Sequence, residues 1–101
     1  MVIISKGIIY EFAGKHPASL NVLNEWWIKT KSADWKTWQD VKKTFNSCDS
    51  IGNDRYVFDI KGNNYRLVAM IHFTIRTVFI RGIFSHPEYE RISKRGRITL
   101  L

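Results

Sequence analysis

Four side chains in the second half of the sequence could together cleave an RNA backbone without a metal ion. They are Arg66, Arg81, His86 and Tyr89. Histidine titrates near neutral pH and can therefore take or give a proton. Tyrosine can orient a ribose 2′-hydroxyl, relay a proton or stack on a base. Arginine stays charged and can bind two oxygens of one phosphate at the same time. Attack of a 2′-oxygen on the adjacent phosphate needs a base, an acid and cations that hold the developing charge, and this set contains all three.

Each of these residues also has a purely structural explanation. His86 stands before Pro87 and could cap a final helix, and Tyr89 could be a core aromatic residue. Arg66 could form an ion pair with Asp59 across a hairpin. For any one residue alone the structural explanation is the better one. Because the residues converge at one end of a basic sheet, the catalytic interpretation is favoured for the group.

Positive charge gathers in the last two-fifths of the sequence. Residues 61–101 carry six of the seven net positive charges of the chain. These charges alternate with β-rich segments and do not form a detached tail. We therefore predict that they bind a polyanionic partner, either nucleic acid or an acidic protein. The alternative, that the charge serves only to keep the protein soluble, is less favoured. Around the four candidate catalytic residues we expect RNA contacts from Lys61, Asn64, His72, Arg76, Arg91, Lys94 and Arg95.

No pattern in the sequence indicates a metal or cofactor site. The three histidines and the single cysteine are scattered, and no phosphate-binding glycine loop or nucleophile elbow occurs. The basic half has no carboxylate cluster, which argues against a two-metal nuclease. We therefore expect no metal and no small-molecule cofactor. Cys48 has no histidine near it in sequence, so an incidental thiol is the better interpretation.

Three β-rich segments would position these side chains: residues 56–60, 64–73 and 77–84. The connections between them, residues 61–64 and 74–76, are short enough for hairpins, which predicts a three-stranded antiparallel meander. Alternation along the second segment puts Leu67, Ala69, Ile71 and Phe73 on one face and Arg66, Val68, Met70 and His72 on the other.

Helices are expected before the sheet, at residues 5–14, 17–31 and 35–45. The first would begin at Ser5 as N-cap and stop at Gly14, and the third would be capped by Thr37 with Asp40. In the second helix the expected buried stripe is Leu20, Leu23 and Trp27, joined less securely by Trp26. Residues 46–55 are expected to be a polar turn, residues 87–93 a final helical turn, and residues 94–101 an arm or an edge strand.

Helices followed by antiparallel strands predict an α+β protein of one domain, residues 1–101, with the helices on one face of the sheet and the other face partly open. The hydrophobic content of 45% fits a packed globular protein. No apolar run is long enough to cross a bilayer, so we expect no membrane association. With no signal peptide pattern and one cysteine, a cytoplasmic location is expected.

The stretch DRYVFDIKGNNYRLVAMIHF, followed by VFIRGIFSHPEYERI, resembles the HigB family of toxins, the host-inhibition type within the RelE/ParE-like superfamily. The shared pattern is F-[DN]-[IV]-x-G-N-x-x-R-[LV], then V-x-[IV]-R, then [ST]-H-x-E-Y. It covers about the last half of the chain. One departure is Phe84 before Ser85, where a more polar residue is expected, and another is the length of the tail after Tyr89.

The resemblance implies a RelE-like microbial ribonuclease fold, with N-terminal helices packed on one face of a three- to four-stranded antiparallel sheet. It also implies an mRNA interferase, an endoribonuclease toxin that cleaves mRNA on the translating ribosome without a metal. The partners implied are mRNA, the ribosome and a HigA-type antitoxin with a helix-turn-helix. Carried over residue by residue, the catalytic groups are Arg66, Arg81, His86 and Tyr89, with Asn64 less firmly placed.

Two other functions remain open on the same fold. One is a ParE-like gyrase poison, against which His86 and Tyr89 argue because a poison needs no acid–base pair. The other is a non-catalytic module that binds RNA or the ribosome through the basic face alone.

Overall fold

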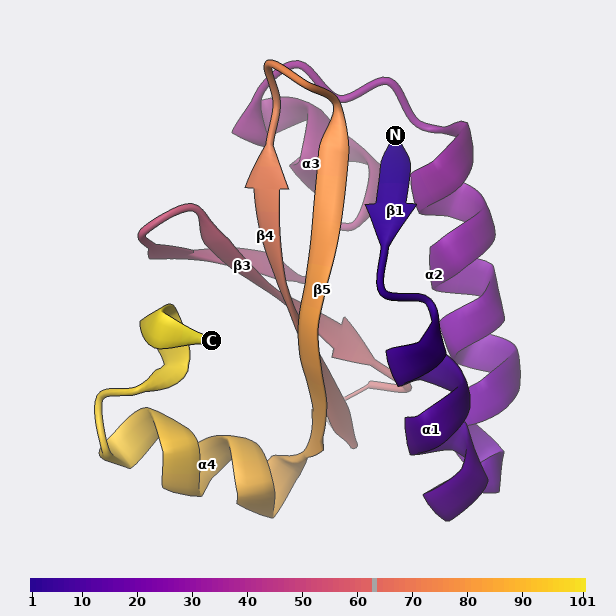
Figure 1. Ribbon diagram of the computed structural model, residues 1–101, viewed down its shortest axis with the longest axis vertical. Coiled ribbons are helices and arrows are strands. Elements are labelled where there is room, and N and C mark those ends of the chain that lie inside the picture. The colour runs from indigo at the N-terminus through magenta and orange to yellow at the C-terminus, as the bar shows by residue number, and fades with distance from the viewer. Residues whose placement is uncertain (63) are drawn as a thin grey trace.

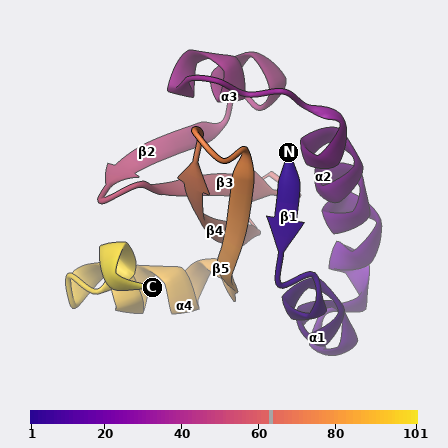
Figure 2. The ribbon, with the colours of Figure 1, turned by 45° about the horizontal axis from the view of Figure 1, so that its top comes forward.

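The computed structural model describes residues 1–62 and 64–101. In these residues five strands form one mixed sheet in the order β1-β5-β4-β3-β2, and helices lie on both of its faces (Figures 1 and 2). The fold is therefore α+β, as predicted, but the sheet has five strands with one parallel pair instead of three or four antiparallel strands, and the helices are not confined to one face. The strands are β1 Val2–Ile4, β2 Cys48–Gly52, β3 Arg55–Ile60, β4 Tyr65–His72 and β5 Thr77–Ser85. The helices are α1 Gly7–Lys15, α2 Leu20–Ser32, α3 Trp38–Thr44 and α4 His86–Lys94, with 3-10 turns at Pro17–Ser19 and Ile98–Leu100.

The predicted meander is present as β3, β4 and β5, each antiparallel to the next. The predicted alternation along β4 is also confirmed: Leu67, Ala69 and Ile71 enter the main core, whereas Val68 joins a smaller cluster on the opposite face. We call the face that carries Arg66 and Val68 the open face. The β3–β4 connection contains Asn63, which lies outside the described residues.

An extra residue in β5 separates Arg81 from the regular pairing. Val68 pairs with Gly82 and Ala69 with Ile80, so Arg81 forms a β-bulge between them. At Gly82 an added Cβ would lie 2.5 Å from the Phe84 ring. The glycine therefore lets that ring lie against the open face.

The first strand was not predicted. Val2–Ile4 pairs in parallel with Thr77–Phe79, and Ile3 packs against the main core. Three residues are too few for a readable alternation, and the partner strand is more than seventy residues away in sequence. The predicted Ser5 cap is wrong, because Ser5 has φ 76° and Lys6 is the N-cap of α1. The predicted stop at Gly14 is also wrong, since α1 continues through Lys15.

Half of the polar turn expected at residues 46–55 is strand β2, Cys48–Gly52. It pairs antiparallel with β3 at the edge of the sheet, where outward polar side chains keep their contact with water. Cys48 is its buried residue. Edge pairing through the backbone explains why the composition of this segment did not reveal a strand.

The helices before the meander form largely as expected. The capping box of Thr37 and Asp40 at the start of α3 is confirmed. The buried stripe of α2 is rotated from the predicted one, because Leu23, Trp26 and Thr30 are buried while Leu20 is 36% exposed. Trp27 is half-buried and lies between two ammonium groups, with Lys6 Nζ 3.8 Å from its ring centroid and Lys31 Nζ 4.6 Å away.

The main core lies between the sheet and helices α1 to α3, and its centre is aromatic. The Phe58 ring is 5.4 Å from the rings of both Trp26 and Phe45. The open face is less exposed than expected, since α4 and the last residues cover part of it (Figure 1). Those last residues form neither an arm nor a strand. Arg55 donates from Nε and Nη2 to the carbonyl of Leu101 at 3.0 and 2.6 Å, and so anchors them on the sheet.

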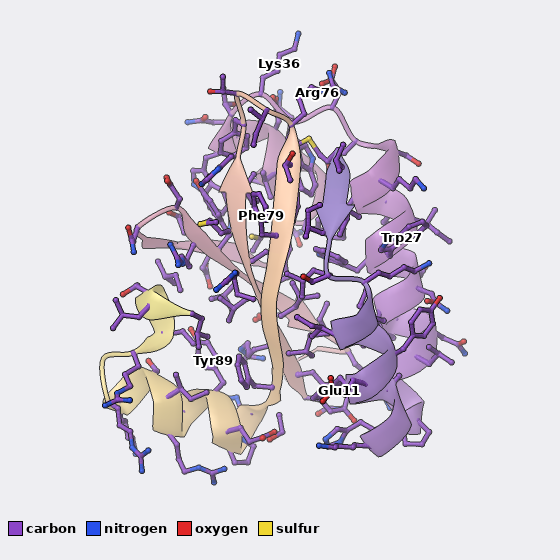
Figure 3. All side chains as sticks on the ribbon, in the orientation of Figure 1. Glu11, Trp27, Lys36, Arg76, Phe79 and Tyr89 are labelled. Carbon is purple, nitrogen blue, oxygen red and sulfur yellow. The ribbon has the colours of Figure 1, made fainter. Side chains whose placement is uncertain are left out.

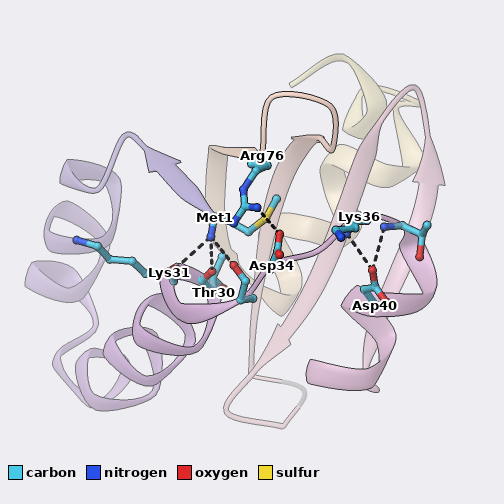
Figure 4. A network of polar contacts seen from close by, with 9 residues as sticks. Met1, Thr30, Lys31, Asp34, Lys36, Asp40 and Arg76 are labelled. Carbon is cyan, nitrogen blue, oxygen red and sulfur yellow. Dashed lines mark hydrogen bonds and ion pairs between the residues drawn. The ribbon is translucent and has the colours of Figure 1, made fainter.

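A polar network joins the start of β1 to the end of α2 (Figure 4). The Met1 ammonium donates to the carbonyl oxygens of Thr30, Lys31 and Ala33, at 3.4, 3.1 and 2.6 Å. These carbonyls belong to the last turn of the helix, where the backbone leaves acceptors unpaired. Burial, with a smaller effect from Arg76, lowers the pKa of this ammonium. No helix in the described part of the chain is long and apolar enough to span a membrane.

Shortening Ile3 should destabilise the protein more than shortening its neighbour Ile4. Ile3 packs on the main core, whereas Ile4 is 43% exposed on the other face. We expect Ile3→Ala to reduce the free energy of unfolding by about 1–2 kcal/mol, below the range for fully buried isoleucines, and Ile4→Ala by less than about 0.5 kcal/mol. Urea denaturation of both variants measures this. Equal losses would mean that β1 does not pair with β5 in this register.

Candidate active site

Arg66, His86 and Tyr89 meet where β5 gives way to α4. Ser85 ends the strand and caps the helix: its hydroxyl accepts from the backbone N–H of Glu88, and its own N–H donates to the Glu88 carboxylate at 3.0 Å. His86 is thus the first helical residue and Tyr89 follows one turn later. Both face the strand that carries Arg66, as the sequence predicted. Figure 3 shows Tyr89 on the side of α4 that faces the sheet, beside the lower end of β5.

The Arg66 side chain holds this cluster together. Its Nε lies 3.2 Å from Asp59 Oδ1, its Nη2 lies 3.3 Å from His86 Nδ1, and its Cζ lies 5.8 Å from the centre of the Tyr89 ring. The side chain is only 12% exposed. The Asp59–Arg66 pair across the hairpin, considered as the structural alternative, is therefore present. It orients the guanidinium toward the histidine and does not remove it from the cluster.

The contact with Arg66 fixes which nitrogen of neutral His86 carries the proton. A guanidinium has donors only, so Nδ1 must accept and the proton of the neutral ring must be on Nε2. Nε2 lies 3.5 Å from Glu90 Oε1, one turn along the helix. His86 therefore has a cationic donor on one side and a carboxylate on the other. The imidazole is 47% exposed, which leaves it accessible to a substrate.

The hairpin between β3 and β4 is tied to the same site. The Asn64 carbonyl accepts from the backbone N–H of His86 at 3.1 Å, and the Asn64 N–H donates to the Lys61 carbonyl. Lys61 and Asn64, both expected to contact RNA, therefore lie at the Arg66 end of the sheet. Both are exposed.

The Tyr89 hydroxyl is kept protonated by its surroundings. Burial raises the pKa of Tyr89, and the Arg66 guanidinium opposes part of that rise. The ring packs in the cluster of Val57, Val68 and Ile98 on the open face. Near neutral pH Tyr89 can therefore donate a hydrogen bond or a proton but cannot act as a base.

Arg81 lies in a different place from the other three candidate catalytic residues. With the residues of α1 it lines a hollow of about 330 Å³ that also holds Lys15, His16, Glu11 and Glu88. The bulge that separates Arg81 from the β4 pairing explains this position. His16, interpreted from sequence as only a boundary residue, stacks on Phe12 with ring centroids 4.4 Å apart.

The remaining candidate RNA contacts divide into two groups. His72 and Arg76 lie at the other end of β4, six or more residues from Arg66, and Arg76 forms an ion pair with Asp34. The second group is exposed: Arg91 and Lys94 lie on α4, and Arg95 is the residue that caps its C-terminus. The structure thus gathers Lys61, Asn64, Arg66, His86 and Tyr89, with the α4 cations nearby on the same helix.

Two carboxylates of the site were not predicted as functional. Glu90 was detectable from its i, i+4 spacing to His86, which brings the two side chains together on a helix. Glu88 was detectable as the last residue of the Ser85 capping box. In residues 1–62 and 64–101 no group of three or more His, Cys, Asp or Glu side chains could hold a metal ion. Burial raises the pKa of the Cys48 thiol, so it is unsuited to act as a nucleophile.

Comparisons with known proteins agree with the resemblance found in the sequence. The profile of the HigB toxin family, the RelE-like toxic component of a toxin–antitoxin system, matches residues 19–92. The mRNA interferase HigB of Escherichia coli O6:H1 is 32% identical over 99 residues, which are 96% of this chain and 96% of that protein. The mRNA interferase toxin HigB of Escherichia coli K12 and the mRNA interferase HigB of Shigella flexneri are each 28% identical over 92 residues, covering 89% of this chain and 88% of each relative.

Glu88→Gln should weaken the start of α4 in a way that depends on pH. The hydrogen bonds from Ser85 lower the pKa of Glu88 in the folded state, so its stabilising effect is present above the unfolded pKa and is lost as the pH falls through the folded value. We expect a loss of about 1 kcal/mol in unfolding free energy at pH 7, shrinking below about pH 4. Denaturation at pH 7 and below pH 4 measures this loss, and the exposed Glu25→Gln substitution is the control. An equal loss at both would contradict an ionised cap.

Proposed function

The chain belongs to the HigB family of RelE-like toxins, and from this membership we propose that it is an mRNA interferase, an endoribonuclease that inhibits translation by cleaving mRNA. The observation that carries the proposal is the contact of Arg66 with both His86 and Tyr89 at an accessible end of the sheet. The relatives named as mRNA interferases match nearly the whole chain. We take residues 1–101 as one RelE-like toxin domain.

In the proposed reaction Arg66 holds the scissile phosphate. Asp59 fixes the guanidinium through Nε, Nη1 donates to the Tyr65 carbonyl at 3.2 Å, and Nη2 lies toward His86 on α4. A guanidinium nitrogen can donate a charge-assisted hydrogen bond to a phosphate oxygen. When a phosphate binds there, the Nη2 hydrogen bond turns from His86 Nδ1 to the substrate. The lone pair of Nδ1 is then free for a proton.

His86 is the proposed base and Tyr89 the proposed acid. His86 Nδ1 takes the proton of the ribose 2′-hydroxyl while the 2′-oxygen forms its bond to phosphorus. The bond from phosphorus to the 5′-oxygen breaks, and the Tyr89 hydroxyl gives that oxygen a proton. The imidazolium and phenolate that remain regain their starting states by exchange with water. Arg66 favours the phenolate electrostatically, since it acts to lower the pKa of Tyr89.

The proposed cleavage needs neither a metal nor a cofactor. All three roles of the reaction, base, acid and phosphate-binding cation, are filled by side chains already in contact. Arg81 remains a proposed contributor from its separate hollow, where it could bind a neighbouring phosphate. The exposed residues Arg91 and Lys94 of α4, with Arg95 at its C-cap, are proposed to bind the RNA backbone, whose charge makes such contacts salt-dependent.

The cellular setting of the proposal follows from the family. We propose that the toxin acts in the cytoplasm on mRNA held by the translating ribosome, and that a HigA-type antitoxin with a helix-turn-helix neutralises it. The net charge of +7 supports a polyanionic target.

Expression of this chain alone in bacteria should arrest growth and cut translated mRNA. The proposed attack by the 2′-oxygen leaves a 2′,3′-cyclic phosphate or 3′-phosphate and a 5′-hydroxyl, so the new 5′ ends should require phosphorylation before ligation. Sequencing RNA ends with and without kinase treatment measures this, and co-expression of the antitoxin is the control. A folded, soluble chain that leaves growth unchanged, or new ends bearing a 5′-phosphate, would contradict the proposal.

Substitutions in the cluster should slow cleavage without unfolding the protein. His86→Gln and Tyr89→Phe each remove a proposed proton transfer, and Arg66→Ala should lower the rate about 10²–10³-fold because it removes a charge from the scissile phosphate. Arg81→Ala is the matched arginine substitution outside the cluster and should raise KM more than it lowers kcat. Cleavage of ribosome-bound messages and thermal melting are measured in parallel. Wild-type rates for both His86→Gln and Tyr89→Phe would show that other groups perform the chemistry.

A further inference from the structure

A second set of side chains lies on the open face, away from the cluster. In the sheet register Ile4 is beside Phe79, and Phe79 is beside Met70, so all three project from the same face. The His72 and Phe79 rings meet edge to face with centroids 5.4 Å apart. Met70, His72 and Phe79 are half-buried and Ile4 is exposed. Figure 3 shows Phe79 beside β4 and β5, on the same side of the ribbon as Tyr89 but farther from α4.

This set continues the surface of the candidate active site. Met70 lies four residues along β4 from Arg66 with its side chain on the same face, a separation of about 13 Å at the rise of an extended strand. Phe79 is the cross-strand neighbour of Met70. The distance is several times the spacing of about 3.4 Å between stacked bases. A base at Phe79 would therefore not be one of the two joined by the bond being cleaved.

His72 also borders a hollow at the end of β4. The hollow has a volume of about 360 Å³ and is lined by Asp54, Ile71, Phe73, Thr74 and Ile75 in addition to His72. Besides His72, the ionisable side chain that lines this hollow is Asp54. A carboxylate accepts hydrogen bonds from the amino groups of bases but repels phosphate. The hollow therefore suits the edge of a base and not the backbone.

We propose that Phe79 and His72 form a stacking subsite for an unpaired base of the message that lies beyond the two nucleotides joined by the cleaved bond. The proposal rests on the proposed function and extends it to a further contact with the substrate. Sheets that expose aromatic rings on one face bind single-stranded RNA in this way, by stacking two or three bases. RNA is favoured over a protein segment as the occupant because the ring pair lies on the surface that also carries Arg66, His86 and Tyr89.

Phe79 variants separate stacking from simple apolar packing. Phe79→Tyr keeps a flat ring, whereas Phe79→Leu keeps apolar volume without one. For a ribosome-bound message we expect Phe79→Leu to raise KM roughly tenfold, a typical loss for one stacked base, with kcat unchanged, and Phe79→Tyr to remain close to the wild-type value. His72→Ala should raise KM in the same direction. Tyr10→Ala is the matched control, because Tyr10 is an aromatic residue 57% exposed on α1.

Abasic messages identify the base that is bound. Removing single bases on either side of the cut should reveal one position where the wild-type KM rises and the Phe79→Leu KM does not rise further. If Phe79→Leu cleaves every message with wild-type KM, or if the Phe79 variants lose only antitoxin binding, the subsite is wrong while cleavage by the wild type still supports the proposed function. If the wild-type protein cleaves no message at all, the proposed function is wrong and the subsite with it.

Discussion

The ion pair between Arg66 and Asp59 is the interaction on which the candidate site depends. Arg66 is nearly buried, and a buried guanidinium needs a partner. Asp59 is the partner, placed opposite it in the β3–β4 register. The pair uses Nε, while Nη1 donates to the Tyr65 carbonyl and Nη2 lies 3.3 Å from His86 Nδ1. The register of the hairpin thus gives a structural ion pair to the same side chain that we propose binds the scissile phosphate.

Local sequence patterns predicted the parts of the fold that local physics determines. The alternation along β4, the hairpin lengths and the capping box at Thr37 all depend on residues close together in the chain. Strands β1 and β2 depend on distant partners instead. Val2–Ile4 becomes a strand because β5 offers a free edge, and Cys48–Gly52 becomes one because β3 does. Neither segment has an alternation of apolar and polar residues that would predict a strand.

The candidate site was predictable to the same extent. His86 and Tyr89 are one helical turn apart, and the β4 alternation gives the face of Arg66, so their meeting follows from spacing alone. The position of Arg81 could not be predicted in this way, because strict alternation along β5 would place Phe79, Arg81 and Ile83 on one face. The bulge at Arg81 breaks that period: Phe79 projects from the open face, whereas Ile83 is in the main core. The position of a bulge depends on how two strands pair and is not encoded in either strand separately.

Helix α4 has no fully buried residue, although it carries both His86 and Tyr89. It is attached to the sheet through the half-buried Tyr89 and Ile92, the Ser85 cap and the hydrogen bond from His86 to the Asn64 carbonyl. A helix with so little buried surface opens locally at a lower free energy than the aromatic core behind the sheet. Opening would take the imidazole and phenol away from Arg66 while the sheet stays folded. Hydrogen exchange would then report two separate stabilities in one small protein, one for the scaffold and one for the assembled candidate site.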